Sequence, residues 1–260
     1  MKQIFNLSAP LLVAVSLLVA GAAPDSSAVE MLTRIARRVE GIDHSATLTI
    51  EKFSRGKLTA TQRMDFFVRY PAADSVIMQT AIELLPGSRG AGQKFWLWQL
   101  THDRKRQWLY SPGSDKLREI TRRRVGGMAL FDLDDLALTE ADIVGMEHAM
   151  GAPDPGSGWI EIRSSAIGKP RRKIKGKRVA ETRLWIDPEH NLVRKSQSFS
   201  TKGNLIQTVE VEATEMAGGI LWATEVKITL ARKQELTRIT MTNLSVRPLT
   251  DDALFMPVRP

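Results

Sequence analysis

The chain has 260 residues, of which 43% are hydrophobic and 25% are charged, and its formal net charge is +8. This composition is that of a folded globular protein and excludes a disordered chain. The sequence contains no cysteine, which excludes disulfide bonds, a thiol nucleophile and a cysteine that could carry a lipid. The fold must therefore be held together by a hydrophobic core.

The first residues predict export from the cytoplasm. Lys2 precedes an apolar run from Ala9 to Ala20, and small residues follow it up to Ala23. This order is typical of a secretory signal peptide, and Ala20 and Ala22 satisfy the A-x-A cleavage rule. An uncleaved anchor is the alternative, but the apolar run is shorter than the roughly 20 residues that span a bilayer. We predict a signal peptide over 1–22, cleavage after Ala22, a periplasmic location and one domain over 23–260.

The segment after the predicted cleavage site has the pattern of an amphipathic helix. Ser27 and Glu30 form a candidate capping box, and Gly41 is a candidate stop. The apolar side chains recur at helical spacing. They are Val29, Leu32, Ile35, Ala36 and Val39. A helix is therefore predicted over 27–41.

Beyond this helix the hydrophobic period changes from 3.6 to 2, which predicts strands. The clearest alternation runs from Ile220 to Leu230, and turn pairs such as Arg55-Gly56 and Gly218-Gly219 separate the runs. About 11 strands joined by short turns favour a mainly β fold with one antiparallel, half-open β-barrel. The segment 122–146 breaks this pattern and is predicted to be a mobile loop with a short amphipathic helix. The segment 152–158 is predicted to be a plain loop.

A strand with two apolar faces points to a binding cavity. In 95–100, Phe95 and Leu97 alternate with Trp96, Trp98 and Leu100, whereas a strand exposed to water on one face would alternate with polar residues. The predicted cavity is lined by aromatic and aliphatic residues and covered by a lid helix. The lining is Met64, Phe66, Val68, Trp96, Trp98 and Trp108, and the lid carries Leu130, Phe131, Leu133 and Leu136. An ordinary core contact is the alternative for these residues.

Motifs for catalysis or for cofactor binding are not found in the sequence. The four histidines, His44, His102, His148 and His190, are far apart and lack metal-ligand spacing. No G-x-S-x-G motif occurs. We therefore predict a protein that is not an enzyme, with no catalytic residues, no metal and no cofactor.

Basic residues are concentrated in 169–178, where seven of ten are Lys or Arg. Nucleic acid is an unexpected partner outside the cytoplasm, and no aromatic residue is interleaved to stack on bases. A solvated hairpin tip is one interpretation. Attraction to anionic lipid headgroups or to an acidic partner is the other, with Arg171, Arg172, Lys173 and Lys175 as candidate docking residues and a transient membrane contact.

The order of these features resembles the outer-membrane lipoprotein-sorting protein family. The resemblance rests on the signal peptide, the N-terminal helix, the meander of strands, the W-x-Y-x-P end of a strand at 108–112, the basic 116–120, the aromatic and acidic 131–136 and the close at 251–255. It covers essentially the whole mature chain. It implies a half-open barrel whose apolar concave face is covered by helices, and a role in carrying lipids or lipoprotein acyl chains across the periplasm to the outer membrane. An inner-membrane transporter and an outer-membrane acceptor are the partners it implies.

One position departs from that family. Its best-known carriers have Arg immediately before the Pro that ends an early strand, where the Arg ties down the lid. Here Tyr70 precedes Pro71 and Arg69 lies one position earlier, so strand alternation predicts that Arg69 faces the other side of the sheet. A periplasmic protein-binding accessory subunit or an envelope-stress regulator on the same scaffold is therefore an alternative to the carrier.

Overall fold

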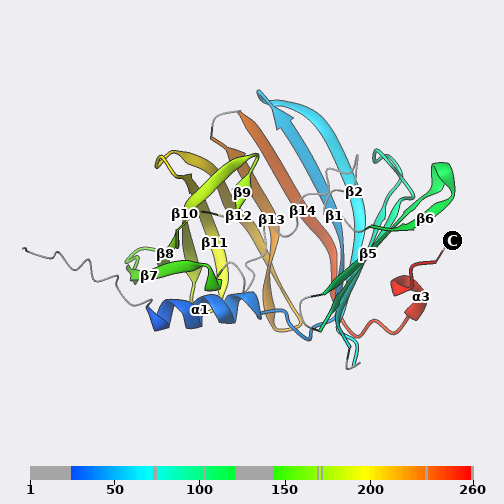
Figure 1. Cartoon of the computed structure of the whole chain (residues 1–260), viewed down its shortest axis with the longest axis horizontal. Helices are drawn as coiled ribbons and strands as arrows, with labels where there is room; N and C mark the ends of the chain where they lie inside the picture. The colour runs from blue at the N-terminus through cyan, green and yellow to red at the C-terminus, as the bar shows by residue number, and fades with distance from the viewer. Residues whose placement is uncertain are drawn as a thin grey trace, which may run out of the picture.

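A computed structural model describes residues 25–72, 75–101, 104–120, 143–168, 170, 172–231 and 234–258. This part of the chain forms one large, open antiparallel sheet of 14 strands with two helices, α1 (Ser26–Ala36) and α3 (Asp252–Phe255), and a single turn of 3-10 helix, η1 (Pro112–Ser114) (Figure 1). The strands are β1 (His44–Ser54), β2 (Lys57–Arg69), β3 (Val76–Leu84), β4 (Lys94–Leu100), β5 (Lys105–Ser111), β6 (Lys116–Glu119), β7 (Met146–Pro153), β8 (Ile160–Ala166), β9 (Lys173–Ile174), β10 (Lys177–Asp187), β11 (Leu192–Ser200), β12 (Leu205–Ala217), β13 (Ile220–Leu230) and β14 (Glu235–Val246).

The strand order is β6-β5-β4-β3-β2-β1-β14-β13-β12-β11-β10-β8-β7, and β9 pairs with β10. Consecutive strands are paired along most of this order. The exceptions are β8, which pairs with β10, and β1, which pairs with β14 and so joins the two halves of the chain. The sheet begins at β6 and ends at β7, and these two edges do not pair with each other in the described part of the chain. The predicted open antiparallel meander is confirmed, but about 11 strands is too low a number.

The additional strands are β6, β7 and β9, whose sequences carry little apolar alternation. β7 begins at Met146 and extends to Pro153, so two predictions are wrong at their ends: the loop over 122–146 and the plain loop from Ala152. The rest of the predicted lid helix, with Leu130, Phe131, Leu133 and Leu136, lies outside the described residues.

The N-terminal helix is confirmed with different ends. It begins one residue before the predicted start, because the Asp25 carboxylate accepts a hydrogen bond of 3.0 Å from the backbone N–H of Ser27. It ends at Ala36 rather than Gly41. Its buried side chains are Ala28, Met31 and Leu32, which pack on Ile162 of β8 and on Leu184 and Ile186 of β10. The helix therefore covers the β8 and β10 side of one face of the sheet.

No helix in the described ranges has both the length and the apolar character that crossing a membrane requires.

Candidate functional site

The face of the sheet that carries α1 is concave and apolar. Phe95 of β4 and Val209 of β12 pack on the same cluster, although five strands separate β4 from β12 in the sheet. Only a strongly bent sheet can bring them together. We call this side the inner face. The register extends it to the side covered by α1, because Val209 pairs with Ser196, which pairs with Leu184.

The inner face has a tightly packed floor and a more accessible upper layer. Seven buried residues form the floor: Leu48, Ile50, Met64, Ile82, Leu84, Ile228 and Ile239. Five partly buried residues pack on it: Phe66, Phe95, Val209, Val226 and Met241. We call these five the inner layer. They come from β2, β4, β12, β13 and β14, so they form one apolar surface across the bend.

An aromatic cluster lies beside the inner layer, near the start of β1. The His44 ring is 4.7 Å from the Trp222 ring and 6.0 Å from the Phe66 ring, between ring centres. Nδ1 of His44 lies 2.8 Å from the Ile42 carbonyl oxygen, so Nδ1 carries the proton in that contact. Burial lowers the pKa of His44, and this outweighs the opposing effects of the Ile42 carbonyl and of Asp43. The imidazole is therefore neutral near pH 7 and forms part of the apolar surface.

A partly buried cation, Arg38, lies next to this cluster. Nη1 of Arg38 donates a hydrogen bond of 2.6 Å to the carbonyl of Leu221, the residue before Trp222. Burial lowers the pKa of Arg38. The inner face is thus apolar across its width, and its polar groups, Arg38 and His44, lie near the start of β1.

The opposite face carries three of the six tryptophans, Trp96, Trp98 and Trp108. Ala81 pairs with both Phe67 and Trp96, and Trp96 pairs with Trp108, so these four residues share one face. Trp98, two residues after Trp96, lies on that face too. They form a cluster with Phe255 of α3. Met64, Phe66 and Val68 pair with Leu84, Ile82 and Thr80 and face the inner side.

The prediction that Met64, Phe66 and Val68 line one cavity together with the three tryptophans is therefore wrong. Successive residues of a strand point to opposite faces, and the register places Trp96, Trp98 and Trp108 on the outer face. The two apolar faces of β4 have separate partners: Phe95 packs on the inner cluster, and Trp96 packs against the C-terminal segment.

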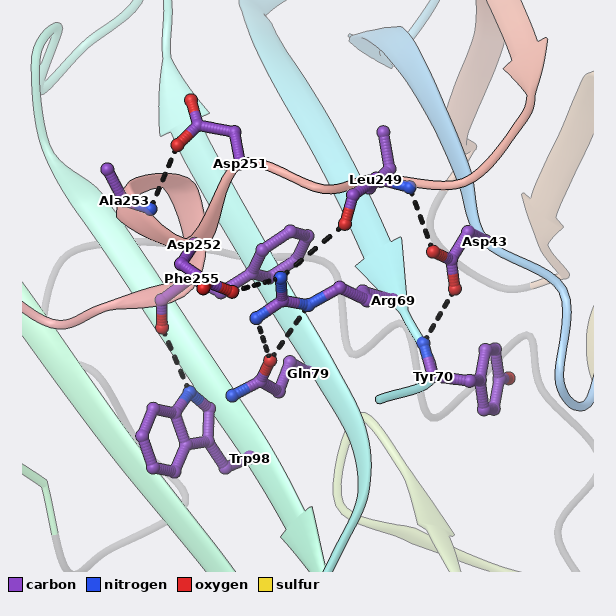
Figure 2. Close-up of polar contacts among 10 residues, drawn as sticks. All are labelled: Asp43, Arg69, Tyr70, Gln79, Trp98, Leu249, Asp251, Asp252, Ala253 and Phe255. Atoms are coloured by element: carbon purple, nitrogen blue, oxygen red, sulfur yellow. Dashed lines mark hydrogen bonds and ion pairs between the residues drawn. The ribbon is translucent and has the colours of Figure 1, made fainter. Parts of the chain in front are cut away.

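The C-terminal segment 249–255 is clamped to the outer face by polar contacts (Figure 2). Arg69 Nη1 lies 2.6 Å from Asp252 Oδ1, and Nε and Nη2 of Arg69 donate to Gln79 Oε1 at 3.1 and 2.6 Å. The indole N–H groups of Trp96 and Trp98 donate to the carbonyls of Leu254 and Phe255 at 2.9 and 3.1 Å. Arg69 thus holds a segment on the outer face, whereas the resemblance implies an Arg that holds a lid.

Tyr70 lies near a carboxylate at the same end of β2. Its backbone N–H donates a 2.8 Å hydrogen bond to Asp43, whose other carboxylate oxygen accepts 2.9 Å from the N–H of Leu249 (Figure 2). Burial, followed by the charges of Glu40 and Asp43, raises the pKa of the Tyr70 hydroxyl to about 12. Tyr70 is therefore un-ionised at any physiological pH.

The predicted docking residues fall in and beside a short hairpin. Lys173 and Lys175 are exposed, Arg172 is partly buried, and Arg171 lies outside the described residues. Ile174 is buried against Val179 and Ile206. The basic segment is therefore anchored to the sheet by an apolar side chain.

Sequence reasoning missed most of the inner layer. The strands that carry Val209, Val226 and Met241 were predicted, but alternation alone does not reveal which side of each strand faces inward. His148 was also missed as a core residue. Its Nε2 lies 2.8 Å from the Ile143 carbonyl and its Nδ1 lies 2.8 Å from Ser164 Oγ, so both ring nitrogens have partners.

Solved structures with the same architecture define the class of fold. The chain is similar to a DUF1329 family protein from Desulfovibrio piger, with TM-score 0.69 and 16% identity over 90% of this chain and 97% of that one. It is similar to a putative outer membrane lipoprotein-sorting protein domain from Vibrio parahaemolyticus, with TM-score 0.66 and 17% identity over 88% of this chain and 96% of that one. A LolA superfamily protein from Nitrosomonas europaea gives TM-score 0.56 and 12% identity over 90% of this chain and 98% of that one.

The chain therefore has the fold of the lipoprotein-sorting proteins, and the predicted resemblance is confirmed at the level of the fold. Residues 78–258 match the model of a family described as "Uncharacterized protein", and the chain belongs to that family. No curated protein matches the sequence.

Proposed function

We propose that the protein is a non-enzymatic periplasmic carrier that binds lipid or lipoprotein acyl chains on its inner face. The observation that supports this most strongly is the inner layer, because five partly buried apolar residues from five strands pack on one buried cluster on the concave side. The shared fold with a putative lipoprotein-sorting domain and the export signal predicted over 1–22 support the same role. An inner-membrane transporter and an outer-membrane acceptor would be the donor and recipient.

The binding energy for such a cargo comes from apolar burial. Each methylene group moved out of water contributes about 0.8 kcal/mol, so a chain of roughly 16 carbons has an upper limit of about 13 kcal/mol. The floor residues Ile50 and Met64 are 2% and 1% exposed. An acyl chain would therefore enter above the floor, by separating the partly buried side chains of the inner layer, and this separation subtracts from the upper limit.

The test uses two adjacent phenylalanines that face opposite ways. Phe66 belongs to the inner layer, and Phe67 packs with the tryptophans on the outer face. Both are partly buried, so Phe66→Gln and Phe67→Gln should lower the melting temperature similarly. Binding of a fluorescent fatty acid to the mature protein should weaken about tenfold or more for Phe66→Gln alone, since an apolar side chain contributes about 1.5–3 kcal/mol when buried.

Equal loss of fatty-acid binding in the two variants would contradict an inner-face site, and so would wild-type binding in Phe66→Gln. Mass spectrometry of lipids extracted from protein purified out of its native periplasm should identify the cargo. Protein from that source that contains no lipid, and that captures none from membranes, would contradict the carrier.

A further inference from the structure

The antiparallel order of the strands gathers six connections at one rim of the sheet. These connections follow every strand that runs in the direction of β1. Their described residues lie within 55–56, 85–93, 112–115, 167–176, 201–204 and 231–234. The turn between β1 and β2 stands at the upper edge in Figure 1. One contact shows that two of these turns meet, because the N–H of Arg55 donates to the Gln234 carbonyl at 3.1 Å. The charge of Lys175 also acts on Lys52 near the end of β1, where it adds to burial in lowering the pKa of Lys52.

This rim carries a concentration of positive charge. The exposed cations in these connections, or in the first residues after them, are Arg55, Lys57, Arg89, Lys116, Lys173, Lys175, Lys177, Arg178 and Lys202. We call these nine residues the basic rim. None of them has an ion pair with a described carboxylate. Counted in the same way, with the two residues that follow each connection, the described part of the opposite rim has three cations and four carboxylates, whereas the basic rim has only the carboxylates Asp115 and Glu235 beside its cations. The charged residues of the opposite rim are Arg104, Lys105, Arg106, Glu147, Asp154, Glu161 and Glu189.

Two of these cations, Arg55 and Lys175, have a positive φ, which other residue types adopt more easily. Arg55-Gly56 and Lys175-Gly176 are two-residue hairpin turns in which all four residues have positive φ, at 50°, 76°, 47° and 82°. Asn, Asp or Gly is preferred at the first position of such a turn, since other side chains clash with the backbone there. The opposite rim follows the preference, with Gly218-Gly219 at its two-residue turn and Asn191 as the residue of positive φ in another turn. The positive charge at the basic rim is therefore present despite a local cost.

Two exposed aliphatic side chains belong to the same connections or follow them directly. Leu58 follows Lys57 and is 54% exposed, and Ile167, which begins the connection 167–176, is 59% exposed. Cations combined with projecting aliphatic groups are complementary to the headgroup and interfacial layers of an anionic membrane.

We propose that the basic rim docks the protein on the surface of a membrane rich in anionic phospholipids, with Leu58 and Ile167 entering the interface. The cations attract the protein to the membrane over a long range. The aliphatic groups contribute a part of the binding free energy that does not depend on salt. Docking by this rim orients the strands toward the bilayer and leaves the C-terminal clamp and the opposite rim directed to the solvent.

The test measures binding of the mature protein to vesicles of phosphatidylethanolamine with phosphatidylglycerol, and to neutral phosphatidylcholine vesicles. Arg55→Asn combined with Lys175→Asn removes two charges and places the preferred residue in both turns, so the fold should be retained. Each cation near an anionic surface strengthens binding about fivefold, so this variant should bind anionic vesicles about 25-fold more weakly in low salt. The difference should almost disappear at about 0.5 M salt, where the Debye length is only a few ångströms.

The matched control removes two positive charges from elsewhere, by Arg34→Gln on α1 and Arg104→Gln at the opposite rim. It should change the affinity less than about twofold, because neither residue belongs to the basic rim and distant charges are screened by salt. Ile167→Ser combined with Leu58→Ser should weaken the binding that remains at high salt. An equal loss in rim and control variants would replace docking with an effect of net charge. Wild-type binding to anionic vesicles by the rim variant would overturn the proposal, and so would equally strong binding of the wild type to neutral vesicles.

Competition with a soluble polyanion such as heparin distinguishes binding to a membrane from binding to other acidic partners. If heparin displaces the protein completely and the aliphatic variant binds vesicles like the wild type, the rim recognises polyanions rather than a bilayer. The docking proposal does not depend on the cargo. Fatty-acid binding in vesicle-free buffer should be unchanged in the rim variant, so loss of one activity can be distinguished from loss of the other.

Discussion

The guanidinium carbon of Arg69 lies 4.3 Å from the centre of the Phe255 ring, so a cation on β2 covers the aromatic side chain of the C-terminal helix. The same guanidinium reaches Asp252, one turn earlier in the helix. Phe255 is 1% exposed, although its helix has only four residues. A helix this short has little stability of its own, so the contacts of Arg69 and the tryptophans hold it in place.

Phe255→Ala should destabilise the protein by about 3–5 kcal/mol, because it leaves a cavity among Trp96, Trp98 and Trp108. Denaturant unfolding followed by tryptophan fluorescence would measure the change. The neighbouring Leu254 is 36% exposed, and Leu254→Ala should have a much smaller effect. Similar losses for the two variants would show that the clamp does not bury Phe255 in solution.

Substitutions at two adjacent glycines, Gly218 and Gly219, provide a second pair of variants to compare. Gly218 and Gly219 both have positive φ, but only at Gly218 would an added Cβ meet the side chain of Val246. Gly219→Ala should cost about 1–2 kcal/mol from backbone strain alone. Gly218→Ala should cost more, since Val246 must move as well. Thermal unfolding of the two variants tests this order, and a more stable Gly218→Ala would contradict the close packing of this turn against β14.

The phenol of Tyr70 should titrate far above the usual value. The chain has two tyrosines, so a Tyr110→Phe variant reports Tyr70 alone. Its absorbance near 295 nm should rise with a midpoint near pH 12 rather than pH 10. Because the folded-state pKa is raised, the neutral phenol stabilises the fold below about pH 10, and this contribution is lost as the pH rises to about 12. A midpoint near pH 10 in folded protein would place Tyr70 in solvent.

His44 should make the protein sensitive to mild acid. Its pKa is lowered in the folded state, so the unfolded chain binds the proton more readily. The fold has its full contribution from neutral His44 above about pH 6.5 and loses it as the pH falls through the lower, folded-state value. His44→Phe should flatten the stability curve below pH 6.5 in urea titrations. A wild-type slope in this variant would assign the acid sensitivity to other groups.

The elements that were predicted well have strong local signals. The strand from Ile220 to Leu230 has the predicted limits, because its alternation is regular and a glycine pair precedes it. β6, from Lys116 to Glu119, has no such signal, since three of its four residues are charged. It is a strand because the backbone of β5 provides a template for pairing, which is a tertiary effect that no local pattern reports.

The candidate site required information that the sequence does not carry. Alternation separates Phe66 from Phe67, but it does not say which of them faces the concave side. The pairing of Ala81 with Trp96 decides that the tryptophans lie outward, and this pairing depends on the turn between β3 and β4. The side on which Arg69 lies relative to Tyr70 was predictable, because neighbouring residues of a strand diverge. The contact of Arg69 with Asp252 was not predictable, since the two residues are 183 positions apart in the sequence.

Among the described residues, β6 and β7 are edge strands with one unpaired side each, and this has a consequence for self-association. An open sheet exposes rows of backbone donors and acceptors that could recruit a strand from another molecule. β6 has only four residues, with Lys116, Arg118 and Glu119 among them, so a docking strand would find a short, charged template. β7 carries Gly151 and Pro153, and Pro has no N–H to offer. The chain can thus keep its barrel open without inviting edge-to-edge polymerisation, and it should stay monodisperse at concentrations where a long apolar edge would aggregate.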